Sequence, residues 1–136
     1  MINKNKYAII AGYAAGFNNI DKNSHVILPG ALKLPFEIPI IFQHKDDQIL
    51  GKVLHSKFDS RGLYVEAALL LNTPLQIRIL DLIKNNSVYG MSVGLKVERS
   101  KMEMGILKII SAHLMEISLT TNPVNPHCNI DFCEEF

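Results

Sequence analysis

Hydrophobic and polar residues alternate in short segments along most of this chain, a pattern typical of half-buried β-strands. Glycine, proline, asparagine and aspartate, which favour turns, stand between these segments. One segment, residues 38–42, is apolar throughout and is predicted to be a fully buried strand. The pattern predicts strands at residues 7–14, 26–28, 38–42, 51–58, 63–71, 88–98 and 106–119.

Polar stretches predict how these strands are connected. Residues 59–62 form a predicted hairpin turn, and residues 45–48 and 100–105 are predicted as further turns. Residues 18–24 are a loop by composition, and residues 31–34 are predicted as a single helical turn. The short acidic end of the chain, after the proline-rich 122–126 segment, is predicted as a tail.

One helix is predicted, and it begins after Thr73. Threonine is a favourable N-cap, and Pro74 suits the first helical position. Residues 85–87 end the helix. Its apolar side chains recur at helical spacing at Leu75, Ile79, Leu82 and Ile83.

Six or seven predicted strands against one helix indicate a mainly β fold of the α+β type. The strands follow one another mostly as hairpins, so an antiparallel β-barrel or sandwich with at least one packed helix is expected. At 136 residues, without repeats or a linker, the chain is predicted to form a single domain over residues 1–136.

Composition narrows the function classes. Hydrophobic residues make up 48% and charged residues 20%, as in globular proteins. The net charge of +1 does not favour nucleic acid or an anionic membrane. Apolar runs fall short of the roughly 20 residues of a membrane helix. The basic start, residues 1–6, precedes a predicted strand rather than a signal-peptide core.

The two cysteines, Cys128 and Cys133, favour a reducing, cytoplasmic setting. His127 lies beside them, but the spacing matches no standard zinc finger. We therefore expect no metal and no cofactor.

Candidate chemistry begins at Ser92, which stands between Gly90 and Gly94 in a Gly-x-Ser-x-Gly pattern. A hydrolase nucleophile elbow needs a helix directly after the serine, whereas a strand pattern continues here. Small neighbours expose the hydroxyl to a substrate; the alternative is a structural bulge where another strand approaches closely.

His44 ends the buried segment at a turn, where histidine is suited to general base catalysis. Glu116, surrounded by apolar residues, is a candidate for the acid that orients it. His113 is a second candidate, and strand alternation places it on the face opposite Glu116. A hydroxyl, an imidazole and an orienting group are the minimum set for serine-type acyl transfer. A structural role for each side chain is the alternative.

In order and spacing, seven segments resemble the prohead maturation proteases of tailed bacteriophages, a family that shares its fold with herpesvirus assemblin. The resemblance covers about residues 7–130. Its segments are Gly12-Tyr13-Ala14, Asp21 with Val26-Ile27-Leu28-Pro29-Gly30-Ala31-Leu32, Ile40-Ile41-Phe42-Gln43-His44-Lys45, Leu50-Gly51-Lys52-Val53, Arg61-Gly62-Leu63-Tyr64-Val65, Gly90-Met91-Ser92-Val93-Gly94-Leu95, and Leu114-Met115-Glu116-Ile117-Ser118-Leu119 with the Asn122-Pro123-Val124-Asn125-Pro126 ending.

The resemblance implies an assemblin-like β-barrel and a serine endopeptidase that trims scaffold or capsid protein inside the immature shell. It maps the family's nucleophile onto Ser92, its histidine onto His44 and its third member onto Glu116, with His113 kept because herpesvirus relatives use a second histidine. It also implies a homo-oligomer, with a dimer as one form, in the cytoplasm of a bacterial host. Nucleic acid and membrane partners are not expected.

Two alternatives accompany this interpretation. A non-catalytic module that binds capsid protein, or a decayed prophage protease, would keep the fold without the cleavage. An esterase would hydrolyse small esters and would carry a helix directly after Ser92.

Overall fold

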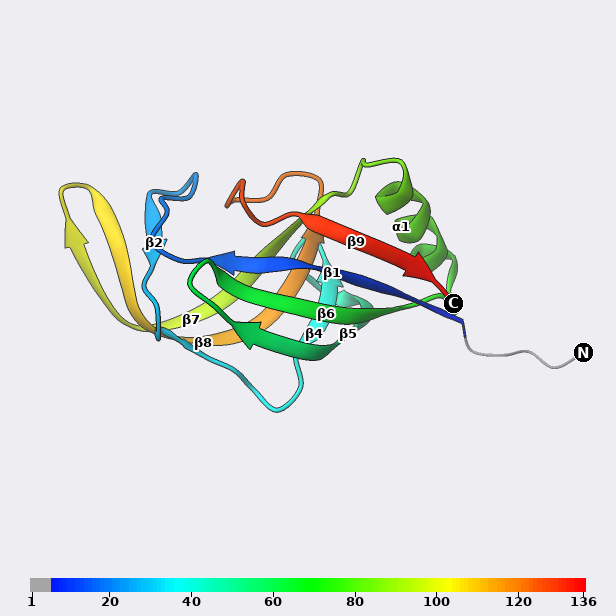
Figure 1. Cartoon of the computed structure of the whole chain (residues 1–136), viewed down its shortest axis with the longest axis horizontal. Coiled ribbons are helices and arrows are strands. Elements are labelled where there is room, and N and C mark those ends of the chain that lie inside the picture. Colours follow the sequence, from blue (N-terminus) through cyan, green and yellow to red (C-terminus); the bar gives the residue numbers. More distant parts are fainter. Residues whose placement is uncertain (1–5) are drawn as a thin grey trace, which may run out of the picture.

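The computed structural model describes residues 6–136; residues 1–5, most of the basic start, lie outside the described part. Nine strands and one helix make up this part of the chain (Figure 1). In chain order they are β1 (Tyr7–Gly16), β2 (His25–Ile27), β3 (Leu32–Lys33), β4 (Pro39–Phe42), β5 (Lys45–Phe58), β6 (Gly62–Leu70), α1 (Pro74–Lys84), β7 (Gly90–Glu103), β8 (Ile106–Thr120) and β9 (Ile130–Glu135).

All nine strands belong to one sheet, in the order β2-β8-β4-β5-β6-β1-β9, with β3 and β7 also paired to β8. The mainly β fold with one helix is confirmed. The sheet is mixed, however, because β2, β3 and β4 each run parallel to β8. It is also not closed, since the end strands β2 and β9 do not pair with each other within residues 6–136. The observed sheet thus differs from the expected antiparallel β-barrel in two details, its parallel pairs and its open edges, while the fold class is as predicted.

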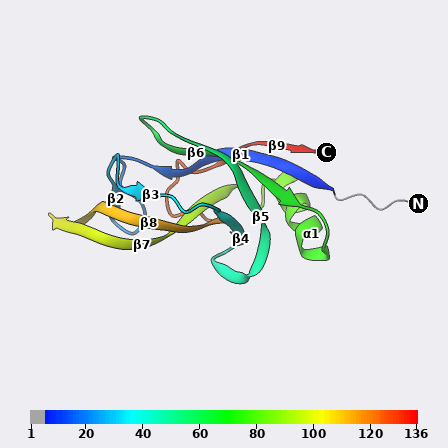
Figure 2. The ribbon, with the colours of Figure 1, turned by 90° about the horizontal axis from the view of Figure 1, so that it is seen from below.

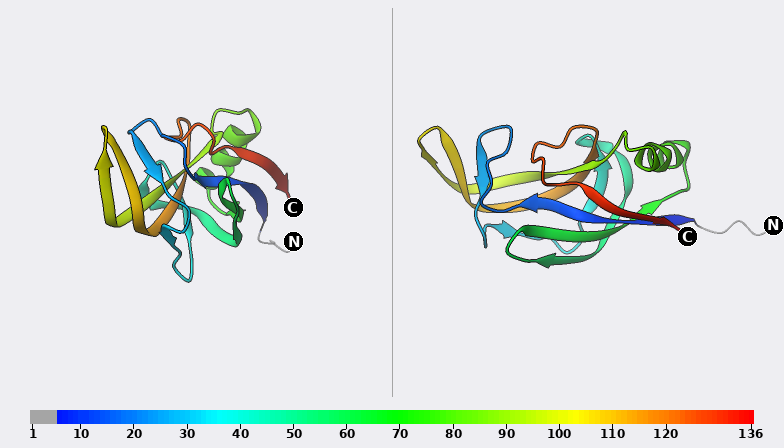
Figure 3. Two further views of the ribbon diagram at one scale, coloured as in Figure 1. Left: turned by 60° about the vertical axis from the view of Figure 1, so that its left-hand side comes forward. Right: turned by 45° about the horizontal axis from the view of Figure 1, so that its top comes forward.

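The β7–β8 hairpin extends at one end of the molecule, and α1 lies at the opposite end, near the end of β9 (Figures 1 and 2). Strands β4 and β5 bend across the middle, beside the part of β8 that carries its last residues (Figure 3). This arrangement brings the β4–β5 turn against β8, where the candidate site lies.

Four local predictions were wrong. Residues 100–103, expected within a turn, continue β7, and the turn consists of Met104 and Gly105. Residues 31–34 contain the short strand β3, which pairs with Ala112 and His113 of β8, in place of a helical turn. Residues 45–48 belong to β5, and the turn lies two residues earlier. The acidic tail forms β9, which pairs with β1.

Helix α1 begins as predicted. The Thr73 side chain accepts a hydrogen bond from the Gln76 N–H at 3.2 Å, and the Gln76 side chain accepts one from the Thr73 N–H, which completes a capping box. Its buried face covers the end of the sheet through Gln76, Ile79, Leu80 and Ile83. Within residues 6–136, no helix has the length and apolar content needed to cross a membrane.

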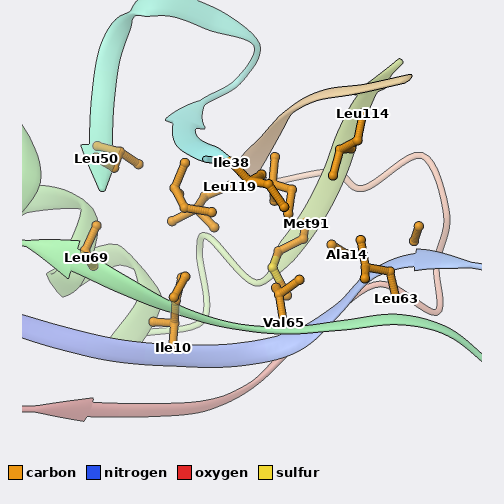
Figure 4. Packing of buried hydrophobic residues seen from close by; sticks show 14 of the residues in the cluster. Ile10, Ala14, Ile38, Leu50, Leu63, Val65, Leu69, Met91, Leu114 and Leu119 are labelled. Carbon is orange, nitrogen blue, oxygen red and sulfur yellow. The ribbon is translucent and has the colours of Figure 1, made fainter. Parts of the chain in front are cut away.

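The core fills the inside of the curved sheet (Figure 4). It contains buried side chains from α1 and from every strand except β9, and the largest fully buried ones include Ile10, Leu50, Leu69, Met91 and Leu114. Few polar side chains are buried with them. They are Gln76, Ser92, Ser118 and Thr120, and three of these four lie on β7 and β8.

Candidate functional site

His44 lies at a strained turn between β4 and β5. Phe42 pairs with Lys45, and the two residues between them, Gln43 and His44, have φ angles of 50° and 59°. Two left-handed residues in a two-residue hairpin form a type I′ turn, which usually contains asparagine or glycine. Other residues adopt this conformation at a cost of about 1 kcal/mol each. The surrounding contacts must therefore hold the turn.

Strand β8 supplies those contacts. The Gln43 N–H donates to the Leu119 carbonyl at 3.0 Å, and the His44 N–H donates to Ser118 Oγ at 2.9 Å. The turn is thus fixed to β8 by its backbone, and the imidazole of His44 has a defined position.

His44 contacts Glu116 directly, with 2.7 Å between Nδ1 and Oε1. Because a carboxylate only accepts hydrogen bonds, this contact places the proton on Nδ1 and leaves Nε2 free to act as a base. The imidazole is 47% exposed and the Glu116 side chain 12% exposed. The pair therefore joins a nearly buried acid to a histidine that solvent can reach.

Ser118 is the site residue that sequence reasoning missed. Its hydroxyl lies 2.9 Å from Glu116 Oε2 and 3.2 Å from His44 Nδ1, in addition to its contact with the His44 N–H. Its position two residues after Glu116 on a strand was the available signal, since such residues share a face.

Ser92 lies on β7, directly opposite Ser118 in the β7–β8 register. Directly paired residues have Cβ atoms about 5 Å apart, so Ser92 is one step across the sheet from the His44–Glu116 pair. The Ser92 hydroxyl accepts a hydrogen bond from the Val124 N–H at 3.3 Å. Ser92 and His44 both line one cavity of about 280 Å³, which Glu116 and Ser118 do not line.

The two glycines around Ser92 have packing roles. A Cβ at Gly90 would collide with the Pro123 ring, and one at Gly94 would overlap the Glu116 carboxylate. The strand continues through both positions, as the strand pattern predicted, and extends beyond the predicted end at Glu98 to Glu103, so no helix follows the serine. The glycines therefore make room for the neighbours of Ser92 and do not form a nucleophile elbow.

The structure places His113 in a different cluster. Its Nε2 lies 3.0 Å from Glu98, which also accepts hydrogen bonds from Lys33 at 2.7 Å and Ser111 at 2.9 Å. The hydrogen bonds from Lys33, then Ser111 and His113, lower the pKa of Glu98 to about 2. His113 does not contact His44, so the geometry joins His44 to Glu116.

This cluster predicts a pH-dependent contribution to stability. Because the folded-state pKa of Glu98 lies below its ordinary value of 4.5, the contribution is present above that value and is lost as the pH falls toward 2. Urea unfolding should show Glu98→Gln less stable than wild type at neutral pH, with the difference disappearing across this range. The effect should be small because the groups are exposed.

A suitable control is Glu134→Gln, since Glu134 is exposed and forms no ion pair within residues 6–136. A stability difference for Glu98→Gln that stays constant from neutral pH to pH 2 would contradict the prediction.

Among the described residues, no three His, Cys, Asp or Glu side chains lie close enough to hold a metal ion. Cys128 and Cys133 are both free thiols. Burial raises the pKa of the Cys128 thiol to about 12, so it is protonated at neutral pH.

Comparison with known structures shows the fold. The chain superimposes on a varicella-zoster virus protease with a TM-score of 0.61 at 18% identity, covering 94% of this chain and 64% of that one. A Kaposi's sarcoma-associated herpesvirus (KSHV) protease in complex with a hexapeptide phosphonate inhibitor gives a TM-score of 0.58 at 11% identity, covering 98% and 65%. The assemblin-like fold is therefore confirmed.

Comparison of sequences shows the family. The chain is 36% identical to the prohead protease of Enterobacteria phage HK97 over 138 aligned positions, which cover 92% of this chain and 60% of that protein. It is 25% identical to a capsid polyprotein of Pseudomonas phage PAJU2, covering 81% of this chain and 18% of the polyprotein. The chain thus spans well under two thirds of the length of these relatives.

The family profile described as Caudovirus prohead serine protease matches residues 1–136. Together with the identity to the HK97 prohead protease, this match shows that the chain belongs to the prohead protease family of tailed bacteriophages.

Proposed function

We propose that this protein is a serine endopeptidase that cleaves capsid or scaffold protein during prohead maturation. Ser92 is the nucleophile, His44 the general base and Glu116 the group that orients it. The observation that carries the proposal is the His44–Glu116 hydrogen bond of 2.7 Å beside a cavity that Ser92 and His44 share. Family membership supports the peptidase reaction.

In the first step, Ser92 Oγ attacks the scissile carbonyl carbon and His44 Nε2 takes the hydroxyl proton. The tetrahedral intermediate then collapses, the C–N bond breaks, and the imidazolium gives the proton to the leaving amine. Water, activated by the same nitrogen, hydrolyses the acyl-enzyme. Ser92 and His44 are not hydrogen-bonded here, and such contacts commonly tighten only when substrate binds.

The Val124 N–H is the best-placed donor for the oxyanion. It points at Ser92 Oγ, at 3.3 Å, and the oxyanion develops on the carbonyl that this oxygen attacks. The Lys22 N–H bonds the Val124 carbonyl at 3.0 Å, and the Asn19 and Asn125 amides bond each other at 2.8 and 3.2 Å, so the loop is held on both sides of Val124.

The substrate is proposed to bind as an added β-strand along β7. At the start of β7, the Met91 N–H bonds the Cys128 carbonyl and the Tyr89 carbonyl accepts from Ile130. Beyond Met91, β7 has no partner strand on that side within residues 6–136. An extended peptide can satisfy these backbone groups. Val93 and Leu95 line the cavity there, which favours small or apolar substrate side chains.

Location and assembly follow from the same proposal. The protein acts in the cytoplasm of the bacterial host, inside the immature capsid, where its substrate surrounds it. Its high local concentration there favours a homo-oligomer. Helix α1 is one candidate dimer contact because Ile77 is exposed on it, and the opposite face of the helix covers the sheet.

The esterase alternative finds no support, because β7 continues as a strand after Ser92. Cleavage of the capsid protein distinguishes the protease hypothesis from the binding-module hypothesis. The wild-type protein is incubated with the capsid protein of the same phage or prophage, and intact masses are recorded. We expect discrete fragments that share one cleavage sequence. An intact capsid protein that nevertheless binds the folded chain would support the binding module.

Gly94 provides a test of the site geometry. In Gly94→Ala, the new Cβ would overlap Glu116 Oε1 and displace the carboxylate from His44. A displacement of about 1 Å in such a pair can reduce kcat about 100-fold. Peptide hydrolysis should show this loss while circular dichroism shows an intact fold.

Gly105→Ala, at the tip of the same hairpin, is the matched control. No atom lies within 4 Å of its Cβ position, and its φ of 80° means that the substitution lowers stability without reaching the site. Equal loss of activity in both variants would contradict the role given to Gly94.

A further inference from the structure

Ser118 has contacts that the proposed mechanism does not use. Its side chain is fully buried, and its oxygen contacts three polar groups: the His44 N–H at 2.9 Å, Glu116 Oε2 at 2.9 Å and His44 Nδ1 at 3.2 Å. Ser118 therefore contacts both the backbone and the ring of His44 and also the side chain of Glu116.

The chemistry of the groups fixes the direction of each hydrogen bond. The His44 N–H can only donate, so Ser118 Oγ accepts there. The Glu116 carboxylate can only accept, so the Ser118 hydroxyl proton is directed to Oε2. Glu116 Oε1 then remains to accept the Nδ1 proton of His44 at 2.7 Å. One hydroxyl therefore ties the position of the His44 backbone to the orientation of the Glu116 carboxylate.

We propose that Ser118 is a positioning residue, which holds His44 and Glu116 in the arrangement that keeps the imidazole proton on Nδ1. The proposal rests on the proposed function, because it assigns Ser118 a part in the same reaction. Ser118 lies beside the site, directly opposite Ser92, but does not line the cavity in which substrate is proposed to bind. It acts through His44, whose turn is strained and whose backbone N–H has Ser118 Oγ as its hydrogen-bond partner.

Removing the hydroxyl in Ser118→Ala leaves the His44 N–H without its partner and frees Glu116 Oε2. We expect kcat to fall about 10- to 100-fold, the usual effect of losing a group that orients an active-site residue. KM should change little because substrate does not touch Ser118. The ¹⁵N chemical shifts of the His44 ring, measured at alkaline pH, should show a single Nδ1–H tautomer in wild type and a mixture of tautomers in Ser118→Ala.

Ser111→Ala is the matched control. Ser111 lies on the same strand and its hydroxyl also donates to a glutamate, Glu98, at 2.9 Å. This variant should keep the wild-type kcat and the wild-type ring shifts of His44. Ser118→Thr, which retains the hydroxyl, should recover the single tautomer. Ser118→Cys, with a weak donor and acceptor of similar size, replaces the alanine variant if that variant does not fold.

The ring shifts separate this proposal from the proposed function. A folded Ser118→Ala or Ser118→Cys protein with an unchanged tautomer and unchanged kcat would overturn the positioning role. The opposite combination is also informative. If Ser118→Ala changes the His44 tautomer but the wild-type protein cleaves no substrate, the positioning role is supported and only the peptidase proposal is overturned.

Discussion

Replacing Ser92 with alanine is expected to reduce kcat for peptide cleavage by at least about 10⁴-fold without unfolding the protein. Loss of the nucleophile from a serine protease removes acyl-enzyme formation, and losses of this size or larger are usual. The fold should tolerate the change, since Ser92 accepts only the Val124 hydrogen bond and alanine fits the same space. Far-ultraviolet circular dichroism and a thermal melt check this point.

A fluorophosphonate probe gives a second measurement of the same prediction. It should label wild type at Ser92, located by peptide mass, and should not label Ser92→Ala. Ser100→Ala is the control on the same strand, because Ser100 is exposed and does not line the cavity. Undiminished cleavage by a pure, folded Ser92→Ala protein would remove Ser92 from the mechanism.

Glu116→Gln is expected to have the second largest effect, a decrease in kcat of about 10²- to 10⁴-fold. Two donors, the Nδ1–H of His44 and the hydroxyl of Ser118, converge on the two carboxylate oxygens. Glutamine offers one acceptor and one donor in the same shape, so one of these hydrogen bonds is lost. The negative charge that supports the imidazolium disappears as well.

His113→Gln decides between the two candidates for the third member. His113 bonds Glu98 and does not contact His44, so this variant should keep kcat within about twofold of wild type. Measuring both variants with the same peptide makes the comparison direct. A large loss in His113→Gln with a small one in Glu116→Gln would reverse the assignment.

Local signals in the sequence were enough for much of the fold. The β5–β6 hairpin was predicted from its turn at Asp59, whose side chain accepts hydrogen bonds from the Arg61 and Gly62 N–H groups. Helix α1 was predicted from Thr73 and Pro74, which form the cap observed. These elements are specified by residues close in sequence, so the sequence pattern contains their signal.

The errors have a common physical origin in non-local pairing. Strand β3 spans only Leu32–Lys33 and forms because β8 lies beside it. The acidic composition of residues 129–136 hides β9, whose strand is held by pairing with β1. The turn at Gln43 and His44 lacks glycine and asparagine, and contacts from β8 stabilise its left-handed backbone. The local sequence around these segments does not indicate which distant strand will pair with them.

The sequence was sufficient to select the candidate site residues, but it did not predict how they are arranged in space. Ser92, His44 and Glu116 were selected from sequence, and the geometry brings His44 and Glu116 into contact. Ser118 was overlooked because a buried serine in an apolar strand resembles many others. Its importance depends on the turn from β4, which lies 74 positions away in sequence.

The pairing of β1 with β9 also bears on when the proposed protease could become active. Ala8 of β1 pairs with Glu135 of β9, and the Met91 N–H, next to Ser92, donates to the Cys128 carbonyl in the segment leading to β9. During synthesis on the ribosome, these bonds form only after the last strand has left the exit tunnel. Such long-range contacts make folding slow. If the proposed function holds, a nascent chain carries Ser92 and His44 before the site is assembled, and the topology itself delays proteolysis of neighbouring chains.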